Sequence, residues 1–235
     1  MPRMSKKTGG NSPRRLRFAV LAADVVLFTV RNNTLLVRLH SVHKPPYFLN
    51  SKGLPGGLID SKETAEQAAK RLIKSKALVD YNKAYLEQLY TFSGIERDPR
   101  GRVVAVAYMA LLPWKGLSPT EQGNTGDVWW SPLAEARRLA YDHDQIIKVA
   151  VDRLRSKSSY STLLGKLMPE EFTLTDLETI YKSILGTSLD KRNFRKKILK
   201  LKILRQVPGK RARGRFRPAR IYRFASKKVQ EIEII

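Results

Sequence analysis

The first two thirds of the chain alternate short apolar runs with turn-forming residues. Such runs, rich in β-branched side chains and of strand length, are typical of buried β-strands. They occupy residues 18–29, 35–39, 86–94, 103–112 and 128–131. Residues 41–57 contain several prolines and glycines and predict a loop.

Helical periodicity appears three times between these runs and residue 156. Residues 64–77 repeat apolar side chains at i, i+3, i+4, i+7 and i+8, which places them on one helix face. Two further helices are predicted over residues 133–140 and 143–156, and a serine-rich hinge over 156–159. Together with the strands, this pattern predicts an α/β sandwich.

The remaining residues have a different pattern. Thr173 or Thr175 is suited to cap a helix that ends at Gly186. A second helix is predicted over residues 190–201, with Ser188 as its candidate cap. A hairpin rich in glycine and arginine over 208–218 and a strand over 219–224 follow. Helix, turn, helix and basic wing is the order of a winged helix-turn-helix domain.

Charge separates the two parts further. The chain has 235 residues and a formal net charge of +24. Residues 191–228 include 17 lysines and arginines and no acidic residue. Such a long acid-free stretch favours a polyanionic partner, and nucleic acid is the first candidate. The absence of cysteine excludes disulfide scaffolds, cysteine nucleophiles and thiolate zinc sites.

The N-terminal residues 1–17 are basic and lack the apolar core of a signal peptide. We expect a disordered basic arm there. No apolar run approaches the roughly 20 residues of a membrane span. The sequence therefore predicts a cytoplasmic protein without a membrane partner.

One motif in the first domain carries a metal site in a known enzyme family. Gly57 is followed after five residues by Glu63 and, after seven more, by Arg71. This spacing resembles the Nudix box of the Nudix hydrolases. The three carboxylate positions of that box are here Leu72, Ser75 and Lys76, and its last glycine is Leu78. Because Mg²⁺ prefers carboxylate oxygens, the departures predict no metal cofactor and no catalysis.

Further strings extend the resemblance over residues 18–225. They are LPGG at 54–57, RDPRGRVVAVAY at 97–108, AYDHDQII at 140–147, LDKRNFRKKI at 189–198 and RPARIYRF at 217–224. The chain is similar to the Nudix-related transcriptional regulators, in which a Nudix-like domain precedes a winged helix. This resemblance implies an α+β protein with an effector-sensing domain at 18–156 and a DNA-binding domain at 160–226. It also implies a homodimeric repressor of NAD-metabolism or sugar-utilisation genes that responds to ADP-ribose or a sugar.

Two groups of candidate site residues follow. The recognition helix and wing are expected to contact an operator, since Arg and Asn suit guanine and adenine edges. These residues are Lys191, Arg192, Asn193, Arg195, Lys196, Arg211, Arg213, Arg215, Arg217 and Arg220. The effector is expected to contact Arg38, Lys52, Gly56, Gly57, Glu63, Arg71, Arg97 and Tyr108, with Arg100 as a further candidate.

Two other functions remain open from the sequence. The chain is alternatively a Nudix hydrolase of ADP-ribose type with an appended nucleic-acid-binding domain, which requires substitute metal ligands. It is alternatively an RNA-binding module whose basic tail lacks sequence specificity. For Glu63 and Arg71, a structural ion pair between loop and helix is the competing interpretation.

Overall fold

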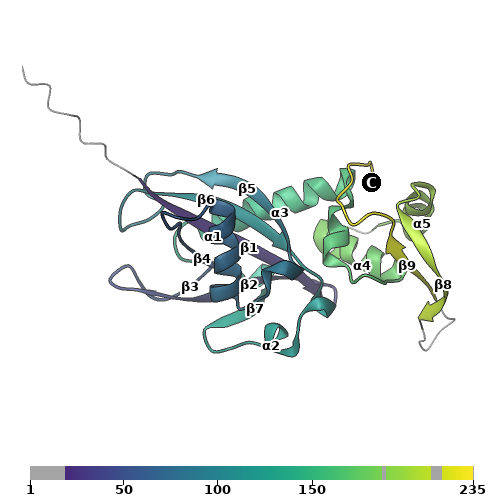
Figure 1. Cartoon of the computed structure of the whole chain (residues 1–235), viewed down its shortest axis with the longest axis horizontal. Helices are drawn as coiled ribbons and strands as arrows, with labels where there is room; N and C mark the ends of the chain where they lie inside the picture. Colours follow the sequence, from purple (N-terminus) through teal and green to yellow (C-terminus); the bar gives the residue numbers. More distant parts are fainter. Residues whose placement is uncertain (1–18, 187–188, 213–218, 235) are drawn as a thin grey trace, which may run out of the picture.

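A mixed β-sheet forms the centre of the N-terminal part (Figure 1). The computed structural model describes residues 19–186, 189–212 and 219–234, and of residues 209–212 it describes the backbone only. The sheet has the order β3-β2-β1-β6-β5, with β4 paired to β1 and β7 to β2; only β1 and β6 are parallel. Its strands are β1 (Val20–Arg31), β2 (Thr34–Lys44), β3 (Phe48–Gly53), β4 (Gly56–Leu58), β5 (Tyr85–Phe92), β6 (Val103–Leu111) and β7 (Val128–Pro132).

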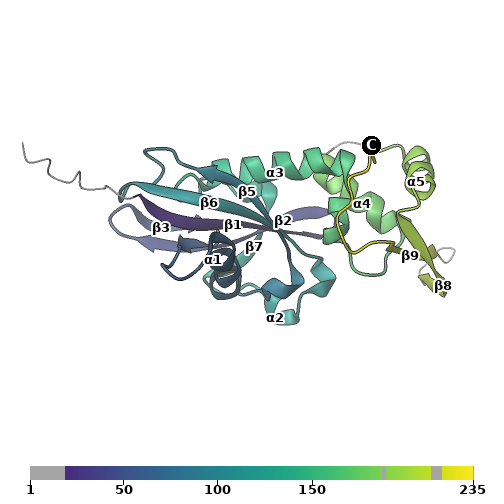
Figure 2. The same ribbon diagram turned by 45° about the horizontal axis from the view of Figure 1, so that its top comes forward.

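Helices cover both faces of this sheet (Figure 2). Alternate residues of β1 point to opposite faces. Val26 and Phe28 pack in the hydrophobic cluster that includes residues of α3 (His143–Tyr160). Leu27 packs in a second cluster, which includes Ile73 at the end of α1 (Ala65–Leu72). The short α2 (Pro119–Gln122) lies on the same side as α1. The predicted α/β sandwich is therefore confirmed.

Two local predictions were wrong. The expected loop at 41–57 contains β3 and β4, because neighbouring strands supply pairing partners that the local sequence does not indicate. The expected helix at 133–140 is only a 3₁₀ turn, Leu133–Glu135. Arg138 and Tyr141 adopt the left-handed φ values of 56° and 58°, which end helical continuation.

The expected hinge at 156–159 is also wrong. Helix α3 continues to Tyr160, and Ser158 is fully buried. The hydroxyl of Ser158 donates to the carbonyl of Arg155 at 2.6 Å, and that of Ser159 to Ser156 at 2.8 Å. Serine hydroxyls that bond to the preceding helical turn remain compatible with a helix.

The C-terminal part contains a pair of helices and a β-wing. Thr173 caps the first helix with a capping box to Asp176, and Gly186 ends it at φ 69°, as predicted. Asp190 caps the second helix by accepting from the amides of Arg192 and Asn193; Ser188 lies outside the described residues. The elements are α4 (Leu174–Leu185), α5 (Lys191–Lys200), β8 (Leu204–Ala212) and β9 (Ala219–Phe224).

The two parts share one hydrophobic core. A single cluster of buried side chains runs from β1 and α3 through the 3₁₀ segment Thr162–Leu167 to α4 and α5. Ser183 of α4 donates to the carbonyl of Asn33 at 2.8 Å, and Arg155 of α3 donates to the carbonyl of Ile184 at 3.0 Å. Within the described residues, no helix combines the length and apolar character needed to cross a membrane. The predicted basic arm 1–17 lies outside them.

Candidate functional site

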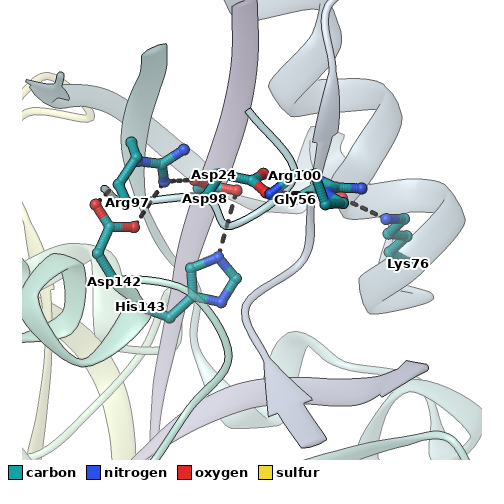
Figure 3. Close-up of polar contacts among 8 residues, drawn as sticks. All are labelled: Asp24, Gly56, Lys76, Arg97, Asp98, Arg100, Asp142 and His143. Carbon is teal, nitrogen blue, oxygen red and sulfur yellow. Dashed lines mark hydrogen bonds and ion pairs between the residues drawn. The ribbon is translucent and has the colours of Figure 1, made fainter. Parts of the chain in front are cut away.

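A cavity of about 690 Å³ opens beside the N-terminal half of β1. Its walls come from β1, β2 and β4, from the helical segment Ile73–Ala77 that follows α1, from the loop before β6 and from the start of α3. Figure 3 shows polar side chains from β1, the loop before β6, the start of α3 and the segment after α1, several of them pointing toward one another. The volume falls within the usual range of small-molecule sites, about 300–1,000 Å³.

A buried ion cluster forms the base of the cavity. Asp24 of β1 accepts from the guanidinium of Arg97 at 3.1 Å. Arg97 also donates from Nε and Nη2 to the two carboxylate oxygens of Asp142, at 2.9 and 2.7 Å. Burial alone would raise the pKa of Asp24, but His143 and Arg97 outweigh it and hold that pKa below its ordinary value. The cluster thus fixes the loop before β6 to both β1 and the start of α3.

His143 connects this cluster to the glycine-rich loop, residues 54–57. The amide of Leu54 donates to Nδ1 of His143 at 3.0 Å. Because Nδ1 accepts, the proton of the neutral ring resides on Nε2, which lies 3.7 Å from Oδ1 of Asp24. The side chain of His143 is buried, with Nδ1 bonded to the loop and Nε2 facing Asp24. The residue therefore positions the loop.

The loop approaches β1 so closely that Gly56 cannot carry a side chain. A β-carbon there would lie 2.0 Å from Oδ1 of Asp24. The end of the box keeps its backbone path although its glycine is replaced, because Leu78 adopts φ 55°. Left-handed backbone at a non-glycine residue costs on the order of 1 kcal/mol. The Nudix backbone thus persists where its consensus residues do not.

The remaining box residues form a clamp outside the cavity walls. Arg71 bonds to both carboxylate oxygens of Glu63, with Nε donating to Oε2 at 3.0 Å, and it donates to the carbonyl of Leu58 at 2.9 Å. The Arg71 side chain and the Asp60 amide hold the pKa of Glu63 at about 2. This geometry favours the structural interpretation of the pair.

The box positions do not fit a divalent metal. Leu72 is buried against Gly57, and Ser75 and Lys76 line the cavity. The ammonium of Lys76 donates to the carbonyl of Gly56. Within the described ranges, no three histidine, aspartate or glutamate side chains are grouped as a metal site. The three box positions therefore supply none of the carboxylates that Mg²⁺ prefers as ligands.

Three of the expected effector residues line the cavity: Gly56, Gly57 and Arg97. Arg38 is fully buried elsewhere, where it donates to the carbonyls of Ala77 and Gly123, each at 3.0 Å. Burial lowers the pKa of Arg38 to about 10, against a smaller opposing effect of Glu121. The other expected residues outside the cavity walls are Lys52, Glu63, Arg71 and Tyr108.

Several cavity residues were missed by reasoning from sequence. Asp24 interrupts an apolar strand run, and a carboxylate at a buried position is a signal that was available. Lys44 and Tyr141 gave no such signal. The Tyr141 ring packs 4.5 Å from the ring of Phe48, and the guanidinium of Arg100 lies 5.3 Å from its centre. Arg100, the further candidate, lines the cavity and pairs with Asp98 at 2.7 Å.

Helix α5 presents a basic exposed surface. Arg192 and Lys196 are exposed and their side chains make no polar contact with the described part of the chain. Asn193 instead donates to Oδ2 of Asp190 at 2.7 Å. Arg195 donates to Thr175 at 3.0 Å and to Glu178 at 3.1 Å. Arg192 and Lys196 are therefore available to a partner, whereas Asn193 and Arg195 stabilise the position of α5.

Glu178 anchors this helix to α4. Its side chain is 4% exposed and pairs with Arg195, with Lys182 at 3.1 Å and with Lys191 at 4.0 Å. On the wing, Arg220 is exposed, and its backbone pairs with that of Arg211. Arg213, Arg215 and Arg217 lie outside the described residues.

Comparison with known proteins adds to these observations. Family models match residues 19–152 to the NUDIX domain and residues 164–224 to the NrtR DNA-binding winged helix domain. A relative from Acinetobacter baylyi, "ADPR responsive transcriptional repressor NtrR", is 33% identical over 211 residues, which are 88% of this chain and 82% of the relative.

Two solved structures from Shewanella oneidensis are similar. NrtR complexed with a 27mer DNA has 35% identity and a TM-score of 0.77, covering 87% of this chain and 93% of that chain. The NUDIX domain of NrtR complexed with ADP ribose has 36% identity and a TM-score of 0.51, covering 62% of this chain and 94% of that chain. With a NUDIX domain, the matching winged helix and these relatives, the chain belongs to the NrtR family of transcriptional repressors.

Proposed function

We propose that this chain is a homodimeric repressor that binds operator DNA and releases it when ADP-ribose occupies the cavity beside β1. The observation that carries the proposal is the combination, in one chain, of a ligand-sized cavity whose Nudix box positions hold no carboxylate and an NrtR winged helix domain. The similar proteins named above for ADP-ribose and for a DNA complex support this assignment.

The DNA-binding surface consists of α5 and the wing. Arg192 and Lys196 contact base edges or phosphates in the major groove, where the start of a recognition helix lies. Arg195 and Asn193 hold α5 in place through Glu178 and Asp190. Arg220 and the remaining wing arginines contact phosphates. Two such surfaces in a dimer match an operator with two-fold symmetry.

The protein does not hydrolyse its effector. Leu72, Ser75 and Lys76 supply no carboxylate at the box positions where the hydrolases of this fold are expected to bind metal. Without a metal-activated water, the cavity binds a diphosphate and leaves it intact. This part of the proposal separates a sensor from a hydrolase with an added DNA-binding domain.

The test begins with a duplex selected from random DNA by the purified protein. Fluorescence anisotropy at fixed salt then measures binding of this duplex and of a scrambled duplex, with and without ADP-ribose. We expect preference for the selected duplex, a steep salt dependence and release by ADP-ribose. Rapid formation of AMP from ADP-ribose with Mg²⁺ would instead establish the hydrolase. Analytical ultracentrifugation tests the dimer.

A further inference from the structure

Lys76 occupies an unusual place in the cavity wall. It lies on a π-helical segment, Ile73–Ala77, that follows α1 directly. Its side chain is partly buried and extends to the glycine-rich loop, where the ammonium donates to the carbonyl of Gly56 (Figure 3). A lysine thus stands at a carboxylate position of the box, and both it and its hydrogen-bond partner Gly56 line the cavity.

The cations of the cavity wall differ in their partners. Arg97 is neutralised by Asp24 and Asp142, and Arg100 by Asp98. In the described part of the chain, no ion pair joins Lys76 or Lys44 to a carboxylate. The free positive charge of the cavity is thus concentrated on two lysines, one of them held in a fixed position.

The surroundings of Lys76 disfavour its charge in the free protein. Burial is the largest effect that lowers the pKa of Lys76, and the charges of Lys44, Arg71 and Arg100 lower it further against the opposing effect of Asp24. An anion in the cavity relieves this repulsion, since it places negative charge beside the ammonium. The positive charge around Lys76 therefore favours binding of an anion in the cavity and disfavours binding of a further cation.

We propose that the ammonium of Lys76 is a built-in substitute for the divalent metal, and that it binds the diphosphate of the effector directly. Effector binding then needs no Mg²⁺. The inference rests on the proposed function, because it assigns a subsite within the same cavity. It extends that function by giving Lys76 a specific role and by predicting independence from metal concentration.

Charge and size support this assignment together. A lysine ammonium is a compact point charge with three donors, and within the described residues one of them is used, by Gly56. The other two are available to phosphate oxygens. Because Gly57 has no side chain, the space beside the ammonium stays open: a β-carbon there would lie 3.7 Å from Nζ. Glycine at this position therefore leaves this side of the ammonium without a side chain in contact with it.

Isothermal titration of the full chain with ADP-ribose tests the proposal in EDTA and in MgCl₂. We expect equal affinity in both for the unaltered protein. Lys76→Met should weaken binding at least tenfold, whereas Lys76→Arg should retain most of the affinity. Lys74→Met is the matched control, because Lys74 is exposed on the same turn and outside the cavity wall. Tryptophan fluorescence and the affinity for the selected duplex verify that each variant is folded.

Two results would overturn the inference: ADP-ribose binding that requires Mg²⁺, or unchanged affinity in Lys76→Met. Release of DNA by ADP-ribose with unchanged affinity in Lys76→Met would refute only the subsite. If ADP-ribose does not bind at all, the proposed effector is wrong, and inorganic pyrophosphate becomes the probe. Pyrophosphate binding in EDTA that is lost in Lys76→Met supports the fixed cation; no binding of pyrophosphate refutes it.

Discussion

Replacing Arg97 tests whether the buried ion cluster holds the cavity together. Its side chain is 4% exposed, and those of Asp24 and Asp142 are 6% and 15% exposed. Arg97→Met leaves two buried carboxylates without their cation, and removing one partner of a buried pair costs about 3–5 kcal/mol. Arg97→Lys keeps the charge but loses the two-pronged contact with Asp142, so we expect a smaller loss of about 1–2 kcal/mol.

The loss should depend on pH in a defined direction. Asp24 has a lowered pKa in the folded protein, so its ionised form contributes stability above the ordinary carboxyl pKa, and that contribution disappears as pH falls. Without Arg97, the ionised Asp24 carboxylate lowers the free energy of unfolding at neutral pH, and this effect disappears once the carboxylate is protonated. The difference between the unaltered protein and Arg97→Met should therefore be largest near pH 7 and shrink below about pH 4.

Urea unfolding followed by tryptophan fluorescence at both pH values measures these differences. Arg137→Met is the control, since Arg137 is exposed and should change the unfolding free energy by less than about 0.5 kcal/mol. Combining Arg97→Met with Asp24→Asn should recover part of the loss. Equal losses at pH 3.5 and pH 7, or equal losses for Met and Lys at position 97, would refute the reasoning.

Two further predictions concern the acid limit of stability and DNA recognition. Burial alone would raise the pKa of Glu121, but backbone amides and the Lys83 ammonium hold it at about 2, so its stabilisation is complete above pH 4.5 and lost toward pH 2. Glu121→Gln should lower the unfolding free energy by about 1–3 kcal/mol at pH 7, and an undiminished difference at pH 2 in acid titrations would contradict this. Arg192→Ala should reduce discrimination at one base pair by about 1–3 kcal/mol, whereas Arg220→Ala should weaken all duplexes and reduce the salt slope by about 0.9. Competition between selected and scrambled duplexes over a salt series distinguishes the two effects. Identical competition and salt profiles for both variants would show that α5 reads no bases.

The sequence predicted elements that are stabilised locally. Helix α4, for example, begins at Thr173, whose side chain accepts from a free backbone amide of the first turn. It ends at Gly186, which adopts the left-handed conformation. The short strands β3 and β4 were missed because they depend on pairing with β2 and β1. Likewise, the serines at the end of α3 suggested a hinge, whereas Ser158 is buried and the hydroxyls of Ser158 and Ser159 bond to the helix backbone.

The site was harder to predict because long-range contacts decide its composition. Arg38 had the right chemistry for an effector, yet its guanidinium bonds to carbonyls 39 and 85 residues away in sequence. Asp24 is 73 residues from its partner Arg97, and no local pattern relates them. The box departures were visible in the sequence. That Lys76 reaches the carbonyl of Gly56 became evident only from the fold.

Helix α3 (His143–Tyr160) connects the cavity with the helices of the C-terminal part. Helix α3 starts at the Asp24–His143 contact and, at 18 residues and about 1.5 Å per residue, extends about 27 Å toward α4. Arg155 attaches the far part of this helix to Ile184, and no flexible linker intervenes. If an effector displaces the first turn of α3, we expect the movement to reach α4 and, through the ion pair of Glu178 with Arg195, helix α5. The change in DNA affinity cannot exceed the difference in effector affinity between the two states. Under the proposed role of Lys76, the extent of the shift depends on the effector concentration, and the affinities of the two states do not depend on the supply of metal.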